Sequence, residues 1–462
     1  MGTEIEDGGT TVVWFRDDLR VRDNPALHEA AQRGGPIVCL FVLDDESEGI
    51  RPIGGAARWW LHHSLEALAT DLHAIGLELT LRRGPAADVV TAVVEETDAA
   101  AVLWNRRYGE VERDIDAGLK SAFREQGRDV ASFHASVLVE PWTILTGQGG
   151  WYKVFTPFYR AVLAKPAPRH PLPAPGGEPL HHRRVVGDDL ATWGLLPRHP
   201  DWAAGLRERW RPGSDGAHER LSSFLRSGVD EYVDEQDFPA EDGTSGLSPH
   251  LRWGEISPFE VWHAVERHRA RAGGAGARGA SAFLRQLVWR DFAYHLLYHL
   301  PSITTENMRP EFDRFPWAEL SDDELERWQQ GRTGIPLVDA GMRELWQTGV
   351  MHNRVRMVTA SFLVKNLRAD WRVGEAWFWD TLVDADPASN ALNWQWVAGS
   401  GPDAAPYFRV FNPELQATKF DAHGAYLDRY VPERGTPEYP DPMVDLKASR
   451  AAALDAYATI KQ

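Results

Sequence analysis

The chain has little cysteine, no long hydrophobic run and no excess of positive charge. Cys39 is the single cysteine among 462 residues, so no internal disulfide can form, which suits a reducing compartment. No apolar stretch reaches the length of a membrane span, and the first residues lack the basic and apolar regions of a signal peptide. These absences predict a cytoplasmic protein without membrane contact. Acidic residues outnumber basic ones by 67 to 50, for a net charge of −17, which argues against a general, charge-driven nucleic-acid binder but leaves room for a local arginine patch.

A further absence concerns nucleotide binding near the N-terminus. Residues 11–135 alternate short β-rich runs with helical stretches, a pattern that predicts a doubly wound parallel sheet. No G-x-G-x-x-G follows the first strand, so a Rossmann-type dinucleotide site is not supported. No metal site is expected either.

The remainder of the chain divides into a connector and a helical region. Several prolines between residues 166 and 175 predict an extended connector over 136–200, after an α/β domain at 9–135. Residues 201–462 repeat apolar side chains every three or four positions, which predicts an all-α domain. Within it, the glycine-rich stretch 270–281 is expected to be an exposed loop.

Tryptophan is unusually abundant, with 20 residues in all and five between residues 371 and 396. In the same stretch, Asp384 and Asp386 stand two apart in a predicted loop, where they could hold the sugar and ring of a nucleotide cofactor, and Asn390 offers an amide to a polar ring atom. Indole is the most easily oxidised of the ordinary buried side chains, so Trp371 and Trp394 could pass an electron hole from that cofactor to the surface. Core filling is the alternative for each indole.

A second polar segment follows Tyr232. The turn Thr244–Ser248, TSGLS, offers hydroxyl and backbone N–H groups that suit a diphosphate near a helix start. Helix capping is the alternative explanation for the same residues.

Several blocks, taken in order, resemble the photolyase and cryptochrome family over nearly the whole chain. They are TVVWFRDDLRVRDNPAL at 11–27, EQDFPAEDGTSGLSPHLRWGEISP at 235–258, FLRQLVWRDF at 283–292, MHNRVRMVTASFLVKN at 351–366, DAAPYFRVFNP at 403–413 and PELQATKFD at 413–421. The resemblance implies an N-terminal antenna domain and a helical domain that binds FAD.

The resemblance assigns a set of FAD contacts in this chain. Arg356 and Asp384 match a buried ion pair beside the flavin, Asp384 and Asp386 match adenosine and ring contacts, and Asn390 matches the residue that faces the reactive nitrogen of the central ring. A neutral amide at that position suits both the anionic reduced flavin and its neutral radical, whereas the aspartic acid of plant-type cryptochromes tends to donate a proton. The remaining implied cofactor contacts are Tyr232, Thr244, Ser245, Gly246, Leu247, Ser248, Arg290 and Asn353.

Three tryptophans match an electron-transfer line to the flavin. Trp394, Trp371 and Trp317 correspond to its inner, middle and outer members, the last with an offset of one residue. The resemblance therefore implies that the protein reduces its own oxidised FAD in light.

The lesion pocket implied by the resemblance has an aromatic wall, because a damaged base must leave the helix stack to reach a buried flavin. One position departs from the pattern: Gln286 stands where photolyases that act on cyclobutane dimers usually carry glutamate, as in (6-4) photolyases and animal cryptochromes. The (6-4) enzymes, however, have paired histidines where this chain has Met351-His352-Asn353-Arg354. The implied substrate and DNA contacts are Gln286, Trp289, Arg290, Asn353, Arg354, Met357, Trp396, Arg409 and Gln416.

The antenna stays open at this point. Residues 51–68, RPIGGAARWWLHHSLEAL, resemble the bacterial subgroup called class III. Glu112 matches an acid that holds a folate antenna in some relatives, but its partner asparagine is replaced by Val111. Methenyltetrahydrofolate, an 8-hydroxy-deazaflavin and no antenna at all are the alternatives.

The resemblance implies a monomeric, FAD-dependent enzyme that repairs cyclobutane pyrimidine dimers in UV-damaged DNA with blue light. The main rival is a cryptochrome, a light receptor without repair activity. Signalling members usually carry a long C-terminal extension, and about forty residues follow the last matching block here. A flavin oxidoreductase that never uses light is a third possibility, but it leaves the tryptophan line unexplained.

Overall fold

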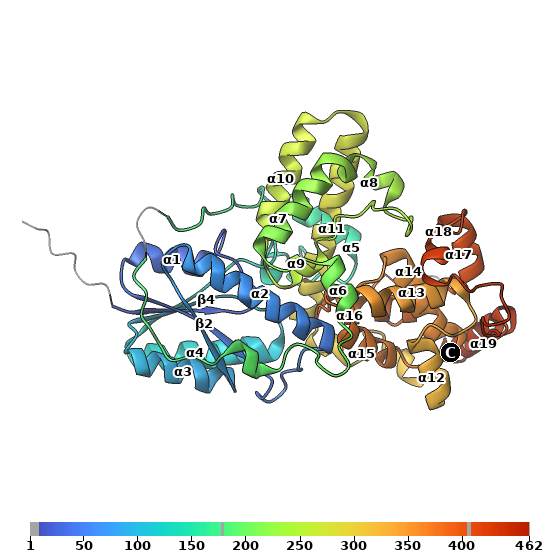
Figure 1. The fold of residues 1–462 in the computed structure, drawn as a ribbon, viewed down its shortest axis with the longest axis horizontal. Helices are drawn as coiled ribbons and strands as arrows, with labels where there is room; N and C mark the ends of the chain where they lie inside the picture. Colours follow the sequence, from blue (N-terminus) through green and yellow to red (C-terminus); the bar gives the residue numbers. More distant parts are fainter. Residues whose placement is uncertain (1–8, 177–179, 404–407, 462) are drawn as a thin grey trace, which may run out of the picture.

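The computed structural model describes residues 9–176, 180–403 and 408–461. Part of the matching block at 403–413 and the first eight residues of the chain lie outside these ranges. The N-terminal part is a five-stranded parallel sheet of order β3-β2-β1-β4-β5 (Figure 1). Its strands are β1 Thr11–Phe15, β2 Ile37–Leu43, β3 Leu79–Arg83, β4 Ala101–Asn105 and β5 Asp129–Phe133. The predicted doubly wound sheet is confirmed.

Helices cover both faces of this sheet. They are α1 Pro25–Arg33, α2 Gly55–His73, α3 Ala86–Thr97 and α4 Glu110–Glu125. One apolar cluster joins α1 and α2 to strand residues such as Val13 and Cys39, and another joins α3 and α4 to alternate residues such as Val12 and Trp14. Because successive side chains of a strand point to opposite faces, the continuous apolar runs of the strands are explained by burial on both sides.

The connector begins after β5, and its described residues contain one α-helix, α5 Phe155–Leu163, and two short 3-10 helices, Pro141–Thr143 and Leu190–Trp193, between irregular segments. It then returns to the sheet, where the Ile37 N–H donates to the His181 carbonyl oxygen at 2.7 Å and the Asp188 N–H to that of Leu81 at 2.7 Å. The second contact covers the open edge of β3, an arrangement that protects an edge strand. The division at residues 135 and 200 stays a prediction.

The C-terminal part is helical and forms two groups beside the sheet domain (Figure 1). The first group comprises α7 Ser214–Ser223, α8 Val229–Glu235, α9 Ser248–Arg252, α10 Pro258–Arg271 and α11 Gly274–His299. The second comprises α12 Asp322–Gln329, α13 Pro336–Thr348, α14 Asn353–Ser361, α15 Trp371–Thr381, α16 Ser389–Ala398, α17 Pro413–Phe420 and α18 Ala425–Tyr430. Two more helices, α6 Ala204–Arg209 and α19 Leu446–Ile460, complete the domain.

The prediction of an exposed loop over residues 270–281 is wrong. Helix α10 continues to Arg271 and α11 begins at Gly274, so the glycine-rich stretch is almost wholly helical. Gly276 and Gly279 are buried, and a Cβ at Gly279 would lie 1.8 Å from the Val229 carbonyl oxygen. Small residues here let α11 approach the backbone of α8, and this gain in packing outweighs their poor helix propensity.

None of the helices in the described part of the chain combines the length and apolar composition that a membrane span requires.

Candidate flavin and DNA site

Asp384 joins three segments of the helical domain. Its carboxylate accepts two hydrogen bonds from Arg356 Nη2, at 3.0 and 3.1 Å, and one from the Ser248 hydroxyl at 2.7 Å. The predicted ion pair between Arg356 and Asp384 is therefore present, with the Asp384 side chain 6% exposed. This single carboxylate links the start of α9, helix α14 and the loop before α16.

Asp386 organises the start of α16. Its Oδ1 accepts from the backbone N–H groups of Ala388 and Ser389, which satisfies donors that a helix leaves free at its N-terminus. Its Oδ2 accepts from the Tyr294 hydroxyl at 2.7 Å. Burial, together with the Asp386 charge, raises the pKa of Tyr294, so the tyrosine stays protonated and remains the donor. The side chain of Asp386 is thus fixed by three donors.

Asn390 is the second residue of α16 and is almost completely buried. Its Nδ2 donates to the Glu375 carbonyl oxygen at 3.0 Å and to Glu375 Oε1 at 2.8 Å. Both partners are acceptors only, so the amide orientation is determined and Oδ1 is left as the acceptor. Within the described chain, no donor reaches that oxygen. An acceptor held in this way suits an N–H group of a ligand ring.

The hydroxyl-rich turn lies directly before α9. Thr244 and Ser248 are exposed, Ser245 is partly buried and Leu247 is buried. The backbone at Gly246 has a φ of +62°, a conformation that favours glycine. Tyr232 is buried against the Phe224 and Phe283 rings and belongs to the same hydrophobic cluster as Leu247 of the turn.

This donor set fits FAD. Exposed hydroxyls in a turn suit a diphosphate, carboxylates at the start of α16 suit ribose and amine groups, and an oriented amide oxygen suits a reduced flavin ring N–H. The fit rests on the chemistry of these groups, which the fold brings together from α9, α14 and α16. The individual roles of the predicted cofactor residues stay predictions.

The tryptophans proposed to carry electrons lie in and beside the core formed by α12–α18. Trp394 and Trp371 are buried, and Trp317 is partly exposed at the edge of the same core. A Cβ at Gly374 would lie 2.1 Å from the Trp394 ring, so the inner indole packs against α15 one turn after Trp371. The Ala318 N–H donates to the Arg368 carbonyl oxygen at 2.8 Å, which ties the segment of Trp317 to the loop just before Trp371.

The residues predicted for the lesion pocket are partly accessible. Gln286 and Asn353 are exposed, whereas Trp289, Met357 and Trp396 are partly buried. Trp289 stacks face to face on Phe155, with ring centroids 3.5 Å apart and planes inclined by 8°. Trp289 and Trp396 belong to different hydrophobic clusters. The structure thus shows the Trp289 ring stacked on Phe155, but it does not place the indoles of Trp289 and Trp396 in one hydrophobic cluster.

The predicted DNA-contacting residues differ in whether their side chains already have partners within the protein. Arg354 pairs with Asp237 at 2.7 Å and lies over the Phe420 ring. Arg409 is exposed and forms no ion pair with a residue that the structure describes. The Oε1 atom of Gln416 is buried and has no hydrogen-bond partner among the residues that the structure describes.

Arg290 lies at a pocket between the two domains. Its guanidinium donates to the carbonyl oxygens of Ser136 and Leu251, and it lines the pocket together with Glu112 and Tyr294. The predicted antenna acid and the predicted cofactor arginine therefore line one cavity. Its position between the sheet domain and α11 supports a role near the domain boundary for both.

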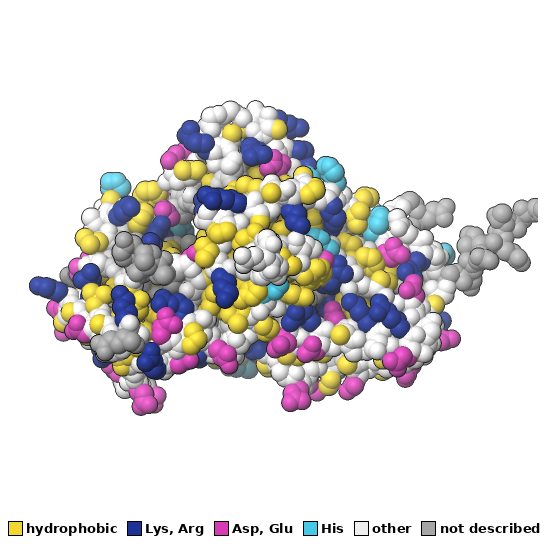
Figure 2. All heavy atoms as spheres, turned by 180° about the vertical axis from the view of Figure 1, so that it is seen from behind, with side chains coloured by type: hydrophobic (Ala, Val, Ile, Leu, Met, Phe, Trp, Pro, Cys, Tyr) yellow, Lys and Arg dark blue, Asp and Glu magenta, His cyan; other side chains and the backbone are white. Residues whose placement is uncertain are grey.

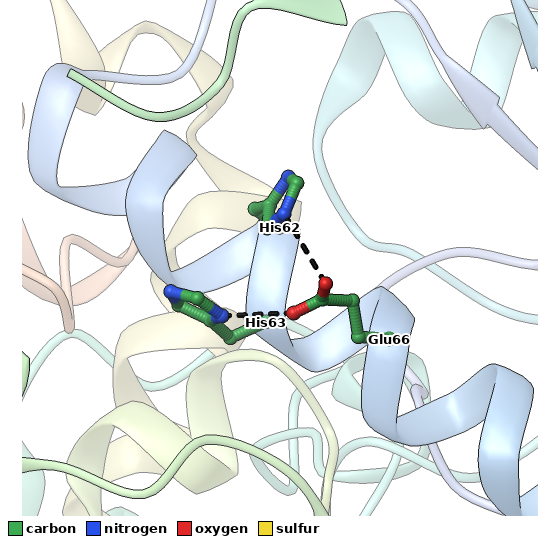
Figure 3. Close-up of side chains that lie close together, drawn as sticks. All are labelled: His62, His63 and Glu66. Atoms are coloured by element: carbon green, nitrogen blue, oxygen red, sulfur yellow. Dashed lines mark hydrogen bonds and ion pairs between the residues drawn. The ribbon is translucent and has the colours of Figure 1, made fainter. Parts of the chain in front are cut away.

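A group of metal-ligating side chains lies on α2, formed by His62, His63 and Glu66 (Figure 3). His63 Nδ1 is 2.9 Å from Glu66 Oε2, and His62 Nε2 is 3.5 Å from Glu66 Oε1. Coordination through His62 Nε2 would place a proton on His62 Nδ1, which is buried without a partner among the described residues. Metal-ligating histidines normally donate that proton to an acceptor. The arrangement therefore favours a hydrogen-bonded His–Glu cluster.

Sequence reasoning missed three neighbours of the site: Glu375, Tyr294 and Phe155. Glu375 lies inside the tryptophan-rich stretch but carries no motif of its own. Tyr294 and Phe155 contact Asp386 and Trp289 across long sequence separations, which no local pattern reveals.

Two family models match the chain: "DNA photolyase" over residues 11–176 and "FAD binding domain of DNA photolyase" over residues 283–437. With this fold and with the relatives below, they show that the chain belongs to the DNA photolyase and cryptochrome family. It carries the FAD-binding domain of that family.

Particular relatives are more informative. The chain is 45% identical to a deoxyribodipyrimidine photo-lyase of Agrobacterium fabrum, over 98% of both chains. A crystal structure of a bacterial class III photolyase from Agrobacterium tumefaciens superimposes with a TM-score of 0.93, at 43% identity, covering 100% of this chain and 99% of the other. Cryptochrome-1 of Arabidopsis thaliana is 37% identical over 92% of this chain and 63% of its own length.

Proposed function

We propose that this protein is a light-driven, FAD-dependent DNA photolyase that repairs cyclobutane pyrimidine dimers. The observation that carries the proposal is the 45% identity to a deoxyribodipyrimidine photo-lyase over 98% of both chains. We further propose that it acts as a monomer in the cytoplasm. When bound in its reduced form, FAD supplies an electron to the dimer after absorbing blue light and accepts it again once the ring has split.

The protein residues bind and orient in this proposal. Arg356 and Ser248 hold the Asp384 carboxylate, Tyr294 holds Asp386, and Asn390 presents its amide oxygen to the ring. Because the reactive chemistry lies in the cofactor, the contribution of the chain is geometry and electrostatics.

The choice between the two lesion types rests on Gln286 and His352. His352 caps α14, its Nδ1 accepting from the Arg354 N–H at 3.2 Å, and burial lowers its pKa to about 4. It is therefore neutral at pH 7, which disfavours it as the donor of the proton that repair of a (6-4) lesion requires. Gln286 can still hydrogen-bond to a thymine carbonyl and ring N–H. The neutral His352 favours the cyclobutane dimer as the substrate, and Gln286 is compatible with it.

Gln286→Glu is expected to leave cyclobutane-dimer repair unchanged or to raise it by up to about ten-fold at limiting DNA, because a charge-assisted hydrogen bond replaces a neutral one. The side chain is exposed on α11, so the fold should tolerate the added charge. Oligonucleotides with one defined lesion, mixed with chemically reduced protein under blue light, measure the effect. Neither form should repair a (6-4) lesion, and clear (6-4) repair by the natural protein would overturn the substrate assignment.

The proposed DNA-binding surface is a basic patch on a protein whose net charge is negative. On the face shown in Figure 2, lysine and arginine side chains stand among hydrophobic ones around the centre, and acidic side chains gather toward the lower edge. Basic groups beside apolar surface suit phosphate contacts next to unstacked bases. Arg409 and Arg354 are the proposed backbone contacts.

Arg409→Ala is expected to weaken binding to damaged and intact DNA alike and to reduce the salt slope of log affinity by about one unit. Arg354→Ala should reduce the slope less, because Arg354 already pairs with Asp237 and must exchange one partner for another. Affinities measured over a series of salt concentrations test both variants. An unchanged slope in Arg409→Ala would remove Arg409 from the DNA interface.

A cryptochrome-type photoreceptor is the second candidate, favoured by the 37% identity to Cryptochrome-1. The two functions separate experimentally: bound, photoreducible FAD without repair of either lesion would support the photoreceptor. For the antenna we propose the pocket that holds Glu112, and both chromophore classes remain candidates.

A further inference from the structure

The Asn390 amide is connected to the sheet domain through two side chains. Glu375, which accepts from Asn390, also forms a two-pronged ion pair with Arg51: Nη1 lies 2.7 Å from Oε1 and Nη2 lies 3.0 Å from Oε2. Glu375 Oε1 thus accepts from both Arg51 and Asn390. Arg51 lies in the loop before α2, 324 residues away in sequence.

The Arg51 loop is docked on α15 by contacts independent of Glu375. The Arg51 guanidinium lies over the Trp379 ring at 4.3 Å, the Trp379 indole N–H donates to the Pro52 carbonyl oxygen at 2.9 Å, and the Gly55 N–H donates to Asp380 Oδ1 at 2.8 Å. These contacts hold Arg51 in place although its side chain is 42% exposed. A stacked, two-pronged arginine is a geometry that lysine cannot reproduce.

The charge of Glu375 requires this partner. Its side chain is only 7% exposed, and a buried carboxylate without a cation is costly. It also stands next to the amide proposed to face the flavin ring, which becomes anionic on reduction. An uncompensated negative charge there would oppose the formation of reduced FAD.

We propose that Arg51 is a positioning residue of the flavin site: it neutralises Glu375 and locks its rotamer, and thereby orients Asn390 and sets the reduction potential of FAD from the sheet domain. This inference rests on the proposed placement of Asn390 at the flavin ring. It gives the N-terminal domain a role in flavin chemistry that does not depend on an antenna.

A double-mutant cycle at Arg51 and Glu375 tests the proposal. Wild-type protein, Arg51→Met, Glu375→Gln and the double variant are titrated anaerobically, and the ratio of reduced to oxidised FAD is read from absorbance at the potential where the wild type is half reduced. Arg51→Met should lower this ratio about three- to ten-fold, because it leaves the partly screened charge of Glu375 without its cation. Glu375→Gln should raise the ratio, because Arg51 then remains without its anion. The double variant should return to within about two-fold of the wild type.

Two further variants separate charge from docking. Asp380→Ala loosens the same loop without touching Glu375, and its ratio should equal that of the wild type. Arg51→Lys keeps the charge but loses the two-pronged contact, so its ratio should fall between those of the wild type and Arg51→Met. If Arg51→Met does not fold, the opposite signs expected for Arg51→Lys and Glu375→Gln still test the proposal.

Three results would overturn it: a ratio for Arg51→Met within two-fold of the wild type, an equal shift in Asp380→Ala, or no recovery in the double variant. Because the titration needs neither light nor DNA, its outcome is independent of repair. Failure of the wild type to repair DNA would instead count against the proposed function.

Discussion

Trp394→Phe is expected to lose photoreduction of bound FAD under blue light with a thiol. Trp394 is the buried indole packed against Gly374 on α15. In the proposed line it is the tryptophan that donates an electron directly to the flavin. Phenylalanine retains an aromatic ring but is far harder to oxidise. Absorbance recorded during illumination measures the loss.

Trp328→Phe is the matched control for this change. Trp328 is also fully buried and meets Trp394 edge to face at 6.3 Å, so both variants disturb the same core, but Trp328 is not part of the proposed line. Its photoreduction should continue. Repair by Trp394→Phe should survive if FAD is reduced chemically, because the electron for the dimer does not travel through the indoles. Photoreduction of Trp394→Phe at the wild-type rate would contradict the assignment.

Trp289→Ala is expected to reduce the preference for damaged over intact DNA by about 5- to 150-fold, which corresponds to about 1–3 kcal/mol of base stacking. The indole stacks on Phe155, so its plane is held rigidly and little entropy is lost when a flipped base contacts it. Binding of intact duplex should change little, because no base leaves the helix there. Competition between irradiated and intact oligonucleotides measures the ratio.

Arg409→Ala provides the contrast for the tryptophan variant. A phosphate contact should weaken both DNAs equally and leave their ratio unchanged. If Trp289→Ala instead weakened damaged and intact DNA to the same extent, its indole would not belong to the lesion pocket.

The sheet could be predicted from sequence because its strands are short, apolar on both faces and separated by amphipathic helices. The glycine-rich stretch at 270–281 could not, since the value of glycine there lies in the approach of α11 to the Val229 carbonyl oxygen. Local propensity indicates a loop, and tertiary packing overrides it.

The site shows the same division. The ion pair of Arg356 with Asp384 was implied by the family resemblance and is present. The long-range contacts of Asp386 and Asn390 come from Tyr294 and Glu375, and the contact that neutralises Glu375 comes from another domain. Such contacts join segments that are far apart in the sequence, so local sequence patterns do not predict them.

Light-driven DNA repair through reduced FAD is the activity that we propose for this protein. The most direct measurement is the recovery of intact thymines in an oligonucleotide that carries one cyclobutane dimer, mixed with chemically reduced protein in blue light and in the dark. We expect repair in the light and none in the dark. Bound, fully reduced FAD without any light-dependent repair would contradict it.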